Sequence, residues 1–181
     1  MYKRFAIAVM ACLALSACQT TTATWQKVNP KDLSFELRDA PALTDSKVIE
    51  TDRFKREVGS ILEAGTLEAG VIYDELFQGG YLNVDSEILS NWVKKYAENP
   101  SNTSENKSIV LPLGRMAYVT FTDGLHTCIL GLVNVGARVS IRGEYGTKAR
   151  LTLSYCAQMK LHKSESKGLA LFKKLRLKNS G

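Results

Sequence analysis

Residues 115–135 read Arg115-Met-Ala-Tyr-Val-Thr-Phe-Thr-Asp-Gly-Leu-His-Thr-Cys-Ile-Leu-Gly-Leu-Val-Asn-Val135. Ala117, Val119 and Phe121 lie on one side of the first part, and this period of two is typical of a β-strand. Asp123-Gly124 follows, a pair that strongly favours a two-residue hairpin turn. Residues 125–135 are apolar on both faces, as expected for a central strand. The stretch therefore predicts an antiparallel hairpin at the centre of the domain.

The alternation continues beyond this hairpin. A turn is expected over residues 134–137, around Gly136, followed by a strand over 138–145 and a further turn at Gly146. Residues 148–159 then alternate again, with apolar side chains on one side and polar ones on the other. Together these segments predict an antiparallel meander of four strands.

Two helices are expected before the meander. The first runs from Ser46 or Asp52 to Ala64, because its apolar residues stand at i, i+4, i+7 and i+8: Phe54, Val58, Ile61 and Leu62. The second is capped by Asp85 or Ser86 and ends at Asn99-Pro100. Residues 66–84 fit a strand or a helix. The sequence thus predicts an α+β fold, with two N-terminal helices packed on an antiparallel β-meander of four to five strands.

The start of the chain carries an export signal. Lys3 and Arg4 precede an apolar run, 5–15, that is too short to span a bilayer. Leu15-Ser16-Ala17-Cys18 then resembles the lipobox of bacterial lipoproteins. That resemblance implies cleavage before Cys18, a diacylglycerol on its thiol and an acyl chain, such as palmitate, on its new amine. Gln19 favours the outer membrane by the same resemblance. The alternatives are a short transmembrane anchor, or an ordinary signal peptide that leaves Cys18 as a free thiol.

These features divide the chain into four parts: a signal peptide (1–17), a lipidated tether (18–45), an α+β domain (46–159) and a basic tail (160–181). The tail holds seven basic residues and one acid, Glu165, although the whole chain has a net charge of only +6. Its leucines at 169, 171, 175 and 177 follow a period of two, which fits a strand better than a helix. We therefore expect a basic edge strand or a mobile arm that contacts anionic envelope groups.

Two cysteines, Cys128 and Cys156, remain in the expected domain. Export implies an oxidising compartment, so the pair predicts one disulfide, with free or reactive thiols as the alternative. His126 and Cys128 stand two residues apart on one expected strand. Side chains at that spacing point in parallel, so a Cys–His nucleophile is disfavoured.

Basic side chains are the remaining candidates for a site. Arg138, Arg142 and Arg150 fall on the polar side of their strands, where they suit an anion or an acidic partner. Lys173, Lys174 and Arg176 of the tail are added to this set. No catalytic residues are assigned, and with two histidines in the chain we expect no metal site. No cofactor is expected beyond the covalent lipid on Cys18.

The leading functional hypothesis is a non-catalytic outer-membrane lipoprotein, lipid-anchored on the periplasmic side, that binds or scaffolds an envelope protein. Exposure at the cell surface is an alternative location. A small-ligand binding module with a pocket between helices and sheet is the alternative function, and a hydrolase ranks third. Nucleic acid is not an expected partner in that compartment.

Overall fold

The structure is a computed structural model that describes residues 23–63, 66–78, 82–83, 87–141 and 144–178. Its elements, in chain order, are β1 (Gln26–Lys27), the 3-10 helix η2 (Pro30–Asp32), β2 (Phe35–Leu37), β3 (Asp45–Glu50), β4 (Phe54–Glu63), β5 (Thr66–Leu76), β6 (Leu82–Asn83), α2 (Glu87–Tyr96), β7 (Pro100–Ser101), β8 (Lys107–Leu111), β9 (Gly114–Asp123), β10 (His126–Ile141), β11 (Glu144–Ala157), α3 (Leu161–Phe172) and β12 (Leu175–Leu177).

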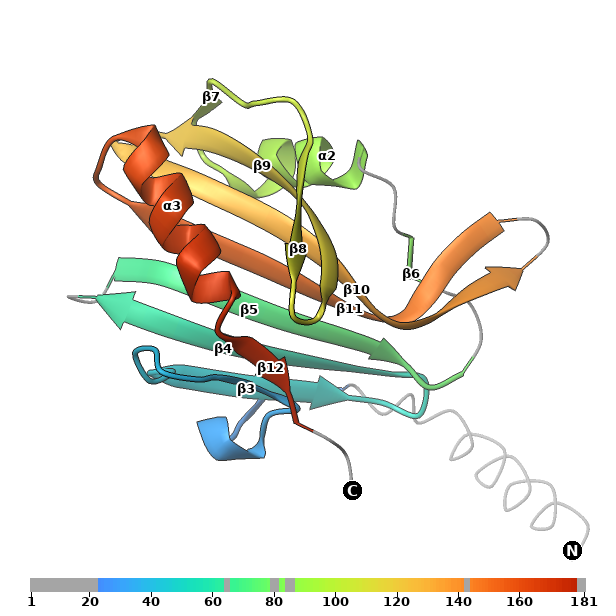
Figure 1. The fold of residues 1–181 in the computed structure, drawn as a ribbon. Coiled ribbons are helices and arrows are strands. Elements are labelled where there is room, and N and C mark those ends of the chain that lie inside the picture. The colour runs from blue at the N-terminus through green and yellow to red at the C-terminus, as the bar shows by residue number, and fades with distance from the viewer. Residues whose placement is uncertain (1–22, 64–65, 79–81, 84–86, 142–143, 179–181) are drawn as a thin grey trace, which may run out of the picture.

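One large antiparallel sheet dominates these ranges (Figure 1). Its strand order is β1-β3-β4-β5-β11-β10-β9-β7, with β6 paired to β11 and β8 paired to β9, while β2 and β12 form a separate pair. The fold is therefore mostly β. The expected α+β class, with two N-terminal helices on a small meander, is wrong.

The expected first helix is replaced by β3 and β4. In β4, Val58 and Ile61 point to opposite faces of the sheet, so the apparent helical stripe is not one surface. Glu57, the residue directly before Val58, is charged and yet fully buried. The pattern failed because this strand buries a carboxylate, which breaks the alternation expected of a half-buried strand.

The hairpin predicted over residues 115–135 is confirmed. Asp123 pairs with His126 across the turn, and Gly124 adopts a φ of 59° that favours glycine. The turn expected around Gly136 is wrong, because β10 continues to Ile141 with a register shift between Val135 and Arg138. The expected strand over 138–145 is therefore the end of β10 and the start of β11. The second expected helix is confirmed as α2.

Each face of the sheet is covered by one helix. The face that we call the α3 face carries the larger core, which includes Val71, Met116, Ile129, Leu153 and Tyr155. The opposite side, the α2 face, carries a smaller core beneath α2 that includes Leu89, Val119 and Cys128. Leu151 and Leu153 point to the α3 face, and Arg150 and Thr152 point to the α2 face.

The two ends of the described chain meet on the α3 face. There β2 pairs with β12 in a two-stranded sheet that we call the terminal clasp (Figure 1). Phe35, Phe172 and Leu175 lose almost all of their exposed surface in it. Leu33 and Phe35, in the range 18–45 assigned to a tether by the sequence, are thus part of the larger core. The tail likewise contains α3, and only its β12 portion is a strand.

A buried carboxylate ties the clasp to the large sheet. Glu57 Oε2 accepts from the Ser34 backbone N–H at 2.6 Å, and its Oε1 accepts from the Ser34 hydroxyl at 2.8 Å. Lys55 Nζ lies 2.6 Å from the same Oε1. A buried charge is tolerated only when it is paired and hydrogen-bonded in this way.

Helix α3 approaches the sheet closely at Gly168. A Cβ there would lie 2.6 Å from Ile129 Cγ2 and 3.2 Å from the Tyr155 side chain. Ser164, one turn earlier, is fully buried and donates to the Thr127 carbonyl at 2.6 Å. Small residues on the inner side of α3 therefore set its distance from β10 and β11.

Candidate functional site

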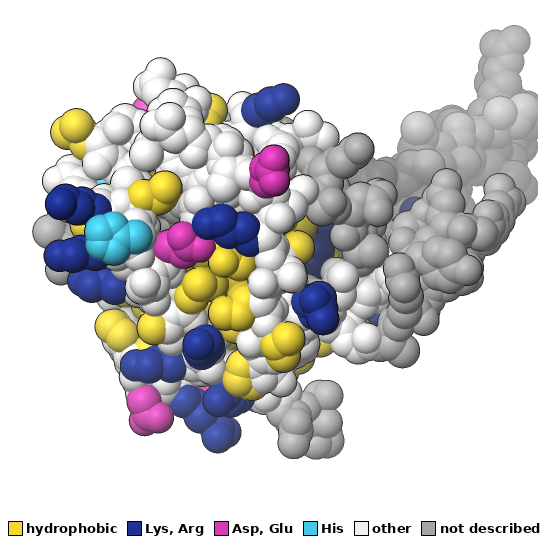
Figure 2. Space-filling model, turned by 45° about the horizontal axis from the view of Figure 1, so that its top comes forward, with side chains coloured by type: hydrophobic (Ala, Val, Ile, Leu, Met, Phe, Trp, Pro, Cys, Tyr) yellow, Lys and Arg dark blue, Asp and Glu magenta, His cyan; other side chains and the backbone are white. Residues whose placement is uncertain are grey.

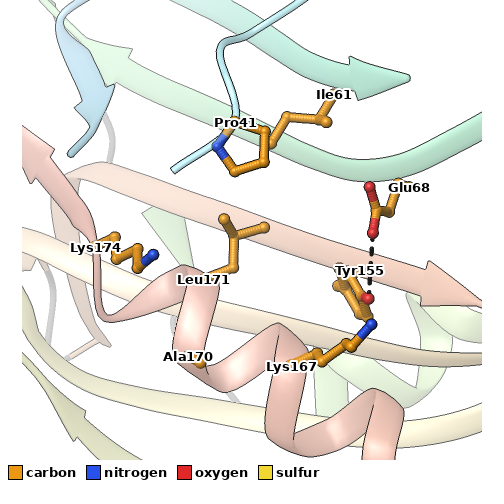
Figure 3. A pocket seen from close by; sticks show the side chains of 8 residues that line it. All are labelled: Pro41, Ile61, Glu68, Tyr155, Lys167, Ala170, Leu171 and Lys174. Atoms are coloured by element: carbon orange, nitrogen blue, oxygen red, sulfur yellow. Dashed lines mark hydrogen bonds between the residues drawn. The ribbon is translucent and has the colours of Figure 1, made fainter. Parts of the chain in front are cut away.

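A groove of about 220 Å³ lies between α3, the large sheet and the loop that connects β2 to β3. Figure 3 shows its walls: Leu171, Ala170 and Lys167 come from α3, Lys174 from the turn after it, and Pro41 from the opposing loop. Ile61 of β4, Glu68 of β5 and Tyr155 of β11 supply the remaining lining. Much of the lining is apolar, while two amines and one carboxylate lie around it.

The polar groups of the groove are partly engaged. The Tyr155 hydroxyl donates to Glu68 Oε1 at 3.3 Å, so this carboxylate lies at the hydroxyl end of the tyrosine (Figure 3). Lys174 Nζ donates to the Asp39 carbonyl, which fixes one side of the groove. Lys167 is exposed on the opposite side. An apolar surface bordered by amines suits a segment or molecule that is both apolar and acidic.

Basic side chains also follow the outer side of α3. Lys163 and Lys167 of α3 and Lys173, the residue directly after it, are exposed, because helical spacing turns them away from the buried Ser164, Gly168 and Phe172. We call these three lysines the basic stripe. The acid of this helix, Glu165, is directed elsewhere: it lies 2.9 Å from Lys107 and accepts from the Tyr118 hydroxyl at 3.0 Å. In Figure 2, Lys and Arg side chains gather on the left of the visible face, beside apolar side chains.

Burial raises the pKa values of two tyrosines on the α3 face, Tyr73 and Tyr118. Burial raises the pKa of Tyr118, and the neighbouring Glu165 raises it further. Burial likewise raises the pKa of Tyr73, with additional contributions from Glu75 and Glu57. Both phenols therefore stay protonated and can act as hydrogen-bond donors at neutral pH.

Of the three arginines expected on an exposed sheet face, Arg150 is the one whose side chain is described, and it is buried. Arg150 is buried on the α2 face, where its guanidinium lies 3.3 Å from Asp74 and 4.9 Å from the centre of the Trp92 ring. Asp74 also pairs with Arg56 at 2.5 Å. Burial lowers the pKa of Arg150 while Asp74 opposes that change. Arg150 thus packs α2 against the sheet instead of offering an anion site. Arg142 and the side chain of Arg138 lie outside the described residues.

The tail residues have unequal roles. Lys173 is exposed, while Lys174 is held by the Asp39 carbonyl. Arg176 donates to the carbonyls of Lys173 and Leu175 at 2.7 and 2.8 Å, so it stabilises the turn between α3 and β12. Of these three, Lys173 is the side chain most accessible to a partner.

The structure joins Cys128 and Cys156, whose Sγ atoms lie 2.08 Å apart. The two residues are direct cross-strand partners on β10 and β11, so the bond connects neighbouring strands of the sheet. Because its sulfur is in this bond, Cys128 has no thiolate to offer a Cys–His mechanism. Cys18, the expected lipidation site, lies outside the described residues.

Neither metal-binding nor membrane-spanning features emerge from the described ranges. They contain no group of three or more His, Cys, Asp or Glu side chains that could hold a metal ion. None of their helices has the length and apolar character needed to cross a bilayer.

The groove itself could not be read from the sequence. Its walls come from positions as distant as 41, 61, 68, 155 and 171, and only the folded chain brings them together. The chain matches no protein-family model, no curated protein and no solved structure.

Proposed function

We propose that the protein is an outer-membrane lipoprotein, anchored through Cys18, whose periplasmic domain binds an acidic segment of an envelope protein along α3. The basic stripe beside an apolar groove carries the binding part of this proposal. Lysines aligned on one helix attract an acidic partner, and the groove accepts its apolar side chains. The resemblance of residues 15–18 to a lipobox supports the anchor, and a disulfide between Cys128 and Cys156 agrees with an oxidising compartment.

The anchor is tested by the intact mass of the membrane-extracted protein. Wild-type protein should begin at Cys18 and carry the mass of its acyl chains, and Cys18→Ser should lack them. A wild-type mass without acyl chains would contradict the anchor, whatever the domain binds.

The binding surface is tested by crosslinking in intact cells. A photoreactive amino acid at Ala170, which is exposed and lines the groove, should yield one discrete crosslinked envelope protein. The same amino acid at the exposed Asn91 of α2 is the matched control and should not.

Charge reversal tests the contribution of the stripe. Lys163→Glu with Lys167→Glu should remove the Ala170 crosslink, because like charges then face an acidic partner. Lys94→Glu with Arg115→Glu changes two exposed cations outside the stripe and should leave it intact. Equal crosslinking by both double variants would rule out the charged stripe as the docking surface.

A small amphipathic anion is the second candidate occupant of the groove. The volume of the groove fits a small molecule better than a whole protein segment. Native mass spectrometry of the purified protein distinguishes the two candidates. A retained small molecule, lost when Ala170→Trp fills the groove, would favour the ligand over the protein partner.

A further inference from the structure

Trp25 is an exposed aromatic residue beside β1, at the edge of the large sheet. It directly precedes β1, and 46% of its surface is exposed. Its ring is not buried in a core but lies under an amine, since Lys47 Nζ is 5.0 Å from the ring centre. An exposed tryptophan combined with lysine is typical of side chains that sit in the headgroup region of a bilayer.

Further cations lie on the N-terminal segment that begins with this tryptophan. Lys27 and Lys31 are exposed on the N-terminal segment, and Lys178 Nζ donates to the Lys31 carbonyl. The clasp thus places a C-terminal cation next to the N-terminal ones; in Figure 1 the blue N-terminal segment and the red β12 share the lower part of the molecule. Three acids belong to the same area: Asp45, 3.7 Å from Lys27, the exposed Asp32, and Glu36, which is near Lys178. Lysines still outnumber acids among these residues.

The distance from the proposed lipid is bounded by the chain. Cys18 and Trp25 are seven residues apart, and an extended chain spans at most about 3.6 Å per residue. The Cα of Trp25 therefore lies within about 25 Å of the lipid-bearing Cα, whatever path the chain takes. Strands β9 and β7 lie at the opposite edge of the sheet, separated from β1 by at least five strands.

We infer that Trp25, Lys27, Lys31 and Lys47 form a membrane-contact surface that binds the anionic phospholipid headgroups beside the anchor. This inference rests on the proposed acylation of Cys18. Lysines in such a position attract an anionic bilayer, and their alkyl stems let the amines reach the headgroups. The surface orients the domain with β1 toward the bilayer and the β9 half of the sheet away from it.

The two tryptophans permit a direct test on the full acylated protein, reconstituted into vesicles of neutral or anionic phospholipid that carry a nitroxide near the headgroup. Trp92→Phe leaves Trp25 as the emitter, and Trp25→Phe leaves Trp92 on α2 as the matched control. We expect the nitroxide to lower Trp25 emission at least about twofold in anionic vesicles and to leave Trp92 emission nearly unchanged.

Charge variants define the surface. Lys27→Gln, Lys31→Gln and Lys47→Gln together should abolish the extra quenching of Trp25 in anionic vesicles, as should high salt. Lys94→Gln, Arg115→Gln and Lys160→Gln remove the same charge elsewhere and should preserve it. Equal quenching of Trp25 and Trp92 in protein whose acyl mass is confirmed would overturn the surface and leave the anchor standing. A protein without acyl mass fails at the earlier step and contradicts the anchor itself.

Discussion

The two helices of this protein cover opposite faces of one sheet and are encoded in different ways. Helix α2 is visible in the sequence, because its apolar residues fall on one side and bury Leu89 and Val93. Helix α3 shows no such stripe; its most buried positions are Ser164, Gly168 and Phe172. The first helix is specified by amphipathic periodicity, and the second by how closely the sheet and the clasp let it approach.

The largest effect is expected where α3 meets the clasp. Phe172 is fully buried among the clasp residues, so Phe172→Ala should lower the free energy of unfolding by about 3–5 kcal/mol. Urea denaturation followed by circular dichroism measures this. Val93→Ala on α2 is the comparison and should cost less, since it removes a smaller side chain from the smaller core. A greater loss for Val93→Ala would reverse the ranking of the two faces.

The disulfide gives the α2 face a covalent constraint of its own. Its residues are 28 apart in sequence, and closing such a loop contributes about 3–4 kcal/mol in the chain-entropy model. The double variant Cys128→Ser and Cys156→Ser should therefore unfold at lower urea concentration, and reduced wild type should match it. A reduced wild type as stable as the oxidised form would show that strand pairing alone holds β10 to β11.

The contrast between α2 and α3 also explains which parts of the structure could be predicted from the sequence. The β9–β10 hairpin and α2 depend on local turn chemistry and periodicity, and both were predicted. The cysteine pair was found by elimination. The expected meander puts Cys128 in its second strand and Cys156 in its fourth, whereas the structure puts them on the neighbouring strands β10 and β11. The α2-face position of Cys156 agrees with its parity beside Arg150 and Thr152.

The expectations that were wrong share a physical cause. In each case the local structure depends on contacts between residues that are far apart in the sequence. Glu57 is buried inside a segment that was expected to be a helix, and its hydrogen bonds come from Ser34, 23 residues away in the sequence. The leucines of the tail, at 169, 171, 175 and 177, span two elements, so their common period of two described only β12. The groove needs the loop at Pro41 to reach α3, which no local pattern encodes.

The Glu57 network offers the third test, with a smaller expected effect. Glu57→Gln keeps the shape of the side chain but removes the charge that faces Lys55 and Ser34. We expect a loss of about 2 kcal/mol in the free energy of unfolding, typical of hydrogen bonds to a charged group. Hydrogen exchange should locate the loss in the clasp, because the Ser34 amide donates to this carboxylate. If the clasp amides of the variant exchanged as slowly as those of the wild type, Glu57 would not be the residue that holds the clasp to the large sheet.

The smallest effect is expected at the surface of α3. Lys107 and Glu165 lie 2.9 Å apart, but their side chains are 41% and 22% exposed, so water and salt screen the pair. Glu165 also accepts from the Tyr118 hydroxyl, which remains in a Lys107→Gln variant and keeps the carboxylate in place. We therefore expect Lys107→Gln to lower the free energy of unfolding by only about 0.5 kcal/mol, with the difference disappearing at high salt. Tyr118→Phe, which removes a largely buried donor, should cost more and should be insensitive to salt. If Lys107→Gln instead matched Phe172→Ala, α3 would be held by charge at its N-terminal half, and the account of a helix positioned by close packing would fail.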